Sequence, residues 1–246
     1  MRRVMELIDK RAAEYRQAPF FALLRDTSIE PRRRLSFAPN VAHYVMSISD
    51  IYQLVLRQEP PQDEYQRLVN AETSEDEVHW QWFMRDLEKL DANPSVPFND
   101  VLRFVWSDAT VQMRMLTYQL CRLGMGADSL RKLVLLHVIE AAGRVTIESI
   151  ASVGREFEVA TGERLVYLGP HHVDAEDAHT LEVPEVQRRL EAVEFGPEEA
   201  ASLLALVDET FGYFGAFIEE MNACAKSGHT IRRPAPTAAA TSAAHT

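Results

Sequence analysis

Three potential metal ligands recur at helical spacing in the second half of the chain. Four residues separate His172 from Glu176, and three more lead to His179. At about 100° per residue, all three side chains fall within about 40° of one face of a helix. Imidazole and carboxylate together suit iron and similar first-row metals. The competing interpretation is a polar helix start after Gly169 and Pro170, with acidic residues placed favourably in the first turn.

A further carboxylate stands inside an apolar stretch. Most neighbours of Glu140 are aliphatic, and a carboxylate buried among them needs a counter-charge or a metal. Arg144, one turn later, is one candidate partner, and it could also pair with Glu148. If Glu140 binds a metal, the guanidinium of Arg144 can instead hold a substrate carboxylate by two parallel hydrogen bonds. The sequence leaves both interpretations open.

Two more candidate ligands occur earlier, seven residues apart. Glu72 and His79 share a face if one helix continues through both, and Asp76 lies near the same face. The segment from Ser74 to Glu77 also matches a capping box, so a new helix could begin at Ser74. That would move Glu72 to a different segment. Whether Glu72 or Asp76 is the ligand beside His79 therefore stays open.

Composition narrows the class of protein. The chain has 246 residues, 46% of them hydrophobic, which is enough for one sizeable core. A net charge of −11 argues against nucleic acid as a partner. Two cysteines favour a reducing compartment, and the charged N-terminus lacks the apolar core of a signal peptide. No run approaches the roughly 20 apolar residues of a membrane span. We expect a cytoplasmic protein without a membrane partner.

Helical periodicity and Pro or Gly stops predict an all-α protein, a single-domain up-and-down bundle with short loops. The expected helices cover about 2–17, 19–26, 36–58, 62–91, 97–123, 127–161, 170–191 and 197–225. The most apolar ones, 97–123 and 127–161, are expected to be the most buried. The run Arg32 to Arg34 is expected to be a solvated helix end or loop. The bundle is expected to span 1–227, followed by a disordered Ala/Pro/Thr-rich tail at 228–246.

Over roughly residues 35–225, the order and spacing of these candidates resemble the haem-oxygenase-like diiron oxidase and oxygenase superfamily. Its signature is a Glu and a His on one core helix, a Glu on a later helix, and then His-x3-Asp-x2-His. The six matching residues are Glu72, His79, Glu140, His172, Glu176 and His179. The departure is Glu176, where the family usually has Asp; its longer side chain puts the tightness of the second iron site in question.

The resemblance implies a bundle of about seven core helices with two Fe(II) ions per chain, the second held more weakly, and O2 as co-substrate. It implies an oxidase or oxygenase that acts on a small molecule, amino-acid-derived or otherwise carboxylate-bearing, in small-molecule biosynthesis. An external electron donor and a homodimer are compatible with it. Two alternatives stay open: a ferritin-like metal-binding bundle, because Glu176 and His179 form a Glu-x-x-His pair, or a metal-free interaction protein.

Overall fold

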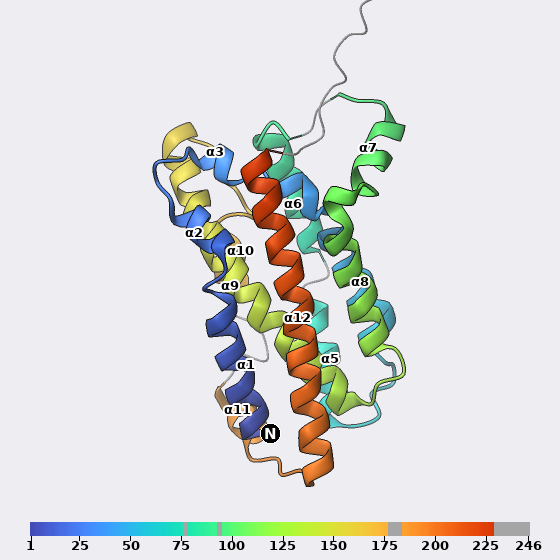
Figure 1. Ribbon diagram of the computed structural model, residues 1–246. Helices are drawn as coiled ribbons and strands as arrows, with labels where there is room; N and C mark the ends of the chain where they lie inside the picture. The colour runs from blue at the N-terminus through green and yellow to red at the C-terminus, as the bar shows by residue number, and fades with distance from the viewer. Residues whose placement is uncertain (76–77, 93–94, 177–183, 229–246) are drawn as a thin grey trace, which may run out of the picture.

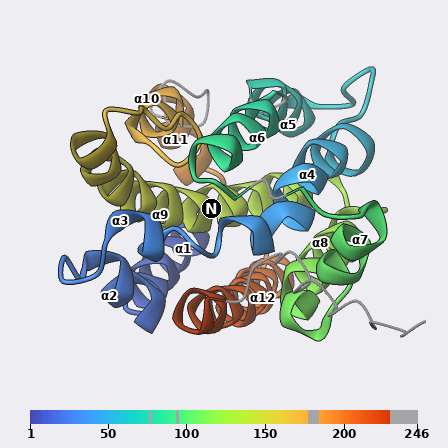
Figure 2. The ribbon, with the colours of Figure 1, turned by 90° about the horizontal axis from the view of Figure 1, so that it is seen from above.

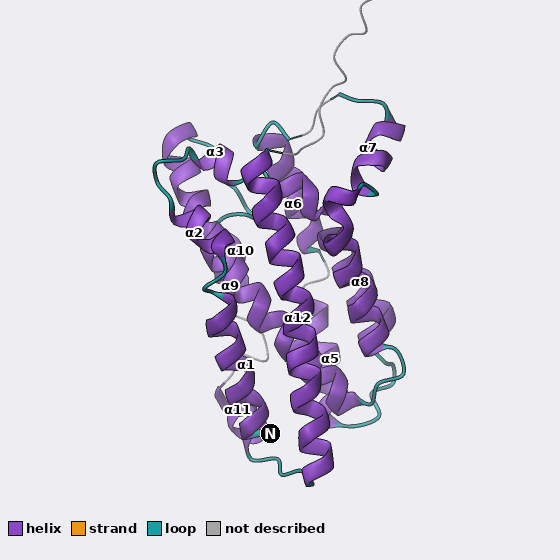
Figure 3. Ribbon diagram, in the orientation of Figure 1, coloured by secondary structure: helices purple, strands orange, loops and turns teal. Residues whose placement is uncertain are grey.

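The computed structural model describes residues 1–75, 78–92, 95–176 and 184–228 (Figure 1). Within these ranges every regular element is helical and no strand occurs (Figure 3), which confirms the all-α prediction. The predicted tail, apart from Gly228, lies outside the described residues.

The elements follow one another as α1 (Arg2–Tyr15), α2 (Pro19–Arg25), α3 (Pro31–Arg34), η1 (Ala38–Val41), α4 (Ala42–Asp50), η2 (Ile51–Leu56), α5 (Glu64–Glu75), α6 (His79–Lys89), α7 (Phe98–Val105), η3 (Asp108–Thr110), α8 (Val111–Gly124), α9 (Ser129–Thr161), α10 (Pro170–Glu176), α11 (Pro184–Glu191) and α12 (Pro197–Ser227). Of these, η1 and η3 are 3-10 helices and η2 is a π-helical turn.

The longest helix, α9, lies in the middle of the bundle. Seen from above, α5, α6 and α10 lie on one side of it and α1, α2 and α12 on the other (Figure 2). The carboxylate of Asp128 caps its start by accepting from the Arg131 amide at 2.8 Å. Gly162, in the left-handed region at φ 77°, ends it. Residues 132–139 are all buried, as expected for a helix that is apolar on nearly every face.

The prediction for 97–123 was wrong in two respects. The segment divides into α7 and α8 around η3, and α7 buries only Phe104. Phe98 is 72% exposed and Trp106 is 57% exposed. Figure 1 shows α7 leaning away from the top of the bundle, so few neighbours cover it. An apolar composition shows only that a helix is able to be buried. Whether it is buried depends on which other segments pack against it, and few pack against α7.

The end of α5 and the start of α6 also differ from both sequence interpretations. Helix α5 continues to Glu75, and the Ser74 hydroxyl donates to the Ala71 carbonyl at 2.6 Å within its last turn. The position before α6 is Val78, so Ser74 does not cap that helix. Glu72 and His79 therefore sit on separate helices. The segment predicted as one helix over 36–58 likewise divides into η1, α4 and η2.

One described helix, α12, is long and apolar enough to cross a membrane by length and composition, and the sequence prediction overlooked it. In its most apolar 18-residue window, 44% of the residues are buried inside the bundle. Core helices of soluble proteins meet the same criteria, and α12 packs against α1, α8 and α9.

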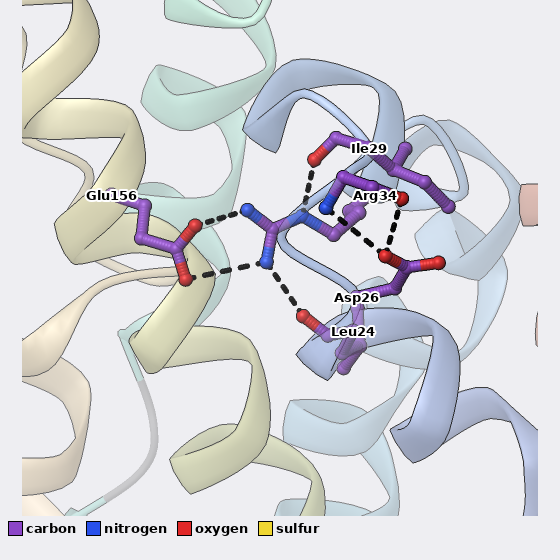
Figure 4. A network of polar contacts seen from close by, with 6 residues as sticks. Leu24, Asp26, Ile29, Arg34 and Glu156 are labelled. Atoms are coloured by element: carbon purple, nitrogen blue, oxygen red, sulfur yellow. Dashed lines mark hydrogen bonds and ion pairs between the residues drawn. The ribbon is translucent and has the colours of Figure 1, made fainter.

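The arginine run at 32–34 is not uniformly solvated, contrary to the prediction. Arg34 is 1% exposed, and its guanidinium donates to the carbonyls of Leu24 at 2.7 Å and Ile29 at 2.9 Å. Both of its terminal nitrogens also meet the carboxylate of Glu156 on α9 (Figure 4). A planar guanidinium can satisfy several acceptors at once, which explains how it is buried between α3 and α9.

Removing Glu156 should therefore be costly. Glu156→Ala leaves a buried guanidinium without its counter-charge, and we expect the free energy of unfolding to fall by about 2 kcal/mol in urea denaturation. The matched control is Asp91→Asn, which breaks the Arg32–Asp91 pair, where the Asp91 side chain is 87% exposed. Exposed pairs contribute less than about 1 kcal/mol. Equal losses in the two variants would contradict the assignment.

Because His137 on α9 is buried, we expect the free energy of unfolding to fall in acid. His137 is 7% exposed, burial lowers its pKa to about 4, and its Nε2 has no hydrogen-bond partner in the part of the chain described. The unfolded chain titrates near 6.5, so it binds the proton more readily than the folded chain between these values. The free energy of unfolding should fall by up to about 3 kcal/mol as the pH drops from 6.5 to 4.

The measurement is urea denaturation at pH 7 and pH 4.5. His137→Leu, which cannot be protonated, should lose this part of the pH dependence. The exposed His171 provides the control, because His171→Ala should keep the full dependence. The same pH slope in His137→Leu and the unsubstituted chain would refute the explanation.

Candidate metal centre

A cavity of about 100 Å³ lies against the middle of α9. Seven other segments contribute to its walls: the chain from Phe37 to Val41, then α4, η2, α6, the turn leading into α10, α10 itself, and α12. Three of the predicted ligands line it, namely His79, Glu140 and His172. Segments far apart in sequence thus place chemically competent side chains around one space.

The two histidines are direct neighbours. The ring centroids of His79 and His172 are 4.9 Å apart, and the rings meet edge to face. Trp82 stacks on His79 at 4.2 Å, and the Tyr167 ring lies 4.4 Å from His172. Both imidazoles are buried, with 6% and 2% of their surface exposed. Aromatic packing on either side therefore restricts the orientation of the pair.

A backbone contact decides where His172 carries its proton. Its Nδ1 lies 2.9 Å from the carbonyl oxygen of Tyr167. A carbonyl oxygen can only accept, so Nδ1 is the donor, and in the neutral ring the lone pair is on Nε2. Metal-binding histidines commonly donate their second N–H to a carbonyl in this way.

Asp86 holds the turn that supplies this carbonyl. Its carboxylate is fully buried on α6 and accepts from the amides of Val166 at 2.9 Å and Leu168 at 2.8 Å. Burial raises the pKa of Asp86, and the amide bonds oppose that shift. His79 and Asp86 are seven residues apart, hence on one face of α6. One helix therefore presents His79 directly and orients His172 through the turn.

Glycine allows the same turn to lie close to α9. A Cβ added at Gly154 would come within 2.3 Å of the Leu168 carbonyl oxygen, which no side chain tolerates. The missing side chain lets the turn before α10 pack on the central helix, next to the histidine pair.

Glu140 meets a partner that the sequence did not reveal. The Tyr52 hydroxyl donates to Glu140 Oε1 at 2.8 Å, and both residues line the cavity. Tyr52 comes from the π-helical turn η2, an element that periodicity did not predict. Tyr167 was also missed. Neither residue belongs to a local motif, so only the three-dimensional packing identifies them.

The structure places none of the other three predicted ligands, Glu72, Glu176 and His179, at this cavity within the described residues. Glu72 is 1% exposed on α5 and does not line it. Glu176 is the last residue of α10; its side chain, like all of His179 and Asp76, lies outside the described residues. Within the described ranges, no three His, Cys, Asp or Glu side chains gather closely enough to hold a metal ion.

Arg144 is half-buried on α9 and does not line the cavity. The alternative pairing with Glu148 meets competition, because Glu148 binds Arg16 at 2.7 Å. The role of Arg144 in holding a substrate stays a prediction.

The donor atoms at this cavity are of types that iron can bind, although the described residues do not gather three of them around one point. Two imidazoles and a carboxylate around one cavity form a nitrogen and oxygen set of the type that first-row metals prefer. The Nδ1–H bond of His172 and the Tyr52 bond to Glu140 supply the outer contacts that orient such ligands. Among known proteins, the chain matches no family model and no curated sequence.

Asp86 should control both stability and the orientation of His172. In Asp86→Asn, one carboxylate oxygen becomes an NH2 group, which cannot accept, so the amides of Val166 and Leu168 must share the one remaining, uncharged oxygen. We expect the free energy of unfolding to fall by about 2 kcal/mol, because charge-assisted bonds to buried amides are weakened or lost. Nitrogen-detected NMR of the His172 ring should show loss of the single Nδ1–H form. Asp100→Asn, at the partly exposed Arg103 pair, is the control. Unchanged His172 signals in Asp86→Asn would contradict the positioning role.

Proposed function

We propose that this chain is a non-haem diiron oxidoreductase that uses dioxygen to oxidise a small molecule. The observation that carries the proposal is the meeting of His79 and His172 at a cavity that Glu140 also lines. The order of the six candidate ligands along the chain, which resembles that of the haem-oxygenase-like diiron oxidases and oxygenases, adds support.

In this proposal the described cavity supplies three ligands, His79, Glu140 and His172. Glu72, Glu176 and His179 complete the set, as the resemblance implies. Ferrous iron bound there would provide the activation of dioxygen.

The protein's own contribution is to prepare these ligands. The Tyr167 carbonyl keeps the proton of His172 on Nδ1, so Nε2 is the atom presented as a ligand. The Tyr52 hydroxyl fixes the orientation of the Glu140 carboxylate and withdraws electron density from Oε1. Apolar walls from α4 and α12 lower the local dielectric constant beside these ligands, which strengthens their polar interactions.

The same walls favour an enzyme over a metal-storage bundle. Storage requires ligands and a path for ions, whereas a cavity bounded by aromatic and aliphatic side chains is suited to an organic molecule. Such lining includes Phe214, Phe217 and Met221 of α12.

Anaerobic titration with ferrous iron, followed by metal analysis and measurement of dioxygen uptake, tests the proposal. The unsubstituted chain should bind two iron ions. His79→Ala and His172→Ala should each weaken binding at least about tenfold or lose an equivalent, because a ligand is removed. The control is His171→Ala, next in sequence but exposed, which should bind as the unsubstituted chain does.

Tyr52→Phe refines the test. It keeps the ring and loses only the bond to Glu140, so iron binding should weaken by about tenfold while the fold is retained. Unchanged iron stoichiometry and affinity in His172→Ala would eliminate the proposed centre.

A further inference from the structure

The side of the cavity formed by α4 and α12 is an aromatic wall. The ring of Tyr44 lies 5.2 Å from that of Phe217 and 6.3 Å from that of Phe214, all by ring centroids. Phe214 and Phe217 are 2% and 4% exposed. Edge and tilted contacts of this kind hold the rings in place, so the wall presents a fixed apolar surface.

The face of α9 toward the cavity lacks a side chain at one position. Ile139, Gly143 and Ile147 follow at intervals of four residues and all line the space. A Cβ added at Gly143 would meet no atom within 4 Å, so neither close packing nor a left-handed turn requires glycine there. Glycine inside a helix is less stable than alanine by about 0.5–1 kcal/mol. The missing side chain leaves open space in the cavity beside Glu140.

The polar atoms on this face are already engaged. The Thr146 hydroxyl donates to the Ala142 carbonyl at 2.9 Å, and Glu140 accepts from Tyr52. No lysine or arginine stands among the described residues that line the cavity. An anionic group placed there would lose its hydration without gaining a counter-charge from this lining, which is unfavourable.

We propose that the cavity binds an uncharged apolar group, a ring or branched alkyl portion of the substrate, and that Gly143 sets the size that is accepted. This rests on the proposed function in treating the bound molecule as the substrate. It also narrows that function: the part of the substrate beside His79, Glu140 and His172 is uncharged, and any carboxylate lies outside the cavity.

Two probes that share one ring test the charge preference. Toluene and benzoate are titrated into the full chain by calorimetry, without added metal. Toluene should bind, and benzoate should bind at least about tenfold more weakly, because its carboxylate must be desolvated and the lining offers the Glu140 carboxylate and no lysine or arginine among its described residues. Benzoate binding as tightly as toluene would overturn the proposal.

Gly143 variants test the size limit. Gly143→Leu should fill the space and weaken toluene binding by at least about tenfold. Gly143→Ala, whose Cβ has room, should fold and show an intermediate loss. Gly212→Leu is the matched control, because a Cβ at Gly212 also meets no atom and the residue lines a different surface hollow with Arg11 and Asp208. Toluene affinity unchanged in both Gly143 variants would refute the role of Gly143.

The two proposals can fail separately. Toluene binding that depends on Gly143 in a chain that binds no iron would retain the apolar site and remove the diiron centre. Iron binding that depends on His172, with no preference for toluene, would retain the diiron centre and remove the apolar site.

Discussion

The burial of α9 is the constraint on which the rest of the structure depends. A long, largely buried helix needs neighbours on every side, and α1, α5, α10 and α12 pack along the length of α9. Each buried polar group on such a helix then needs a hydrogen-bond partner, a counter-charge or a neutral form. His137 is held neutral, Glu140 receives the Tyr52 hydroxyl, and Glu156 reaches outward to the guanidinium of Arg34. The helix that organises the core thus also determines where polar chemistry is placed.

The pairing of His79 with His172 follows from this packing through a short chain of contacts. Asp86 binds the amides of the turn before α10, and Gly154 lets that turn approach α9. The turn's Tyr167 carbonyl then orients His172. Two buried backbone donors satisfied by one carboxylate hold the turn more firmly than a surface contact would. The site is therefore positioned by a core carboxylate that itself does not line the cavity.

The sequence predicted what local periodicity encodes. Helices α1, α9 and α12 lie close to the expected ranges because apolar spacing and Pro or Gly stops act within a few residues. The exposure of α7, the burial of Arg34 and the π-helical turn η2 depend on how distant segments pack. No local sequence pattern therefore predicted them. The site divides in the same way. Residue type and spacing pointed to His79, Glu140 and His172, whereas Tyr52 and Asp86 become apparent only through their partners.

Several features around the cavity are unfavourable for stability taken alone. Gly143 weakens the middle of α9, two imidazoles and a carboxylate are withdrawn from water, and the space between α4, α9 and α12 is not filled by side chains. Apolar residues of suitable volume at these positions would pack better. Natural chains keep such departures from good packing mainly where function requires them. These departures meet at one cavity, and a mostly apolar cavity with a few polar side chains is the usual form of a small-molecule binding site.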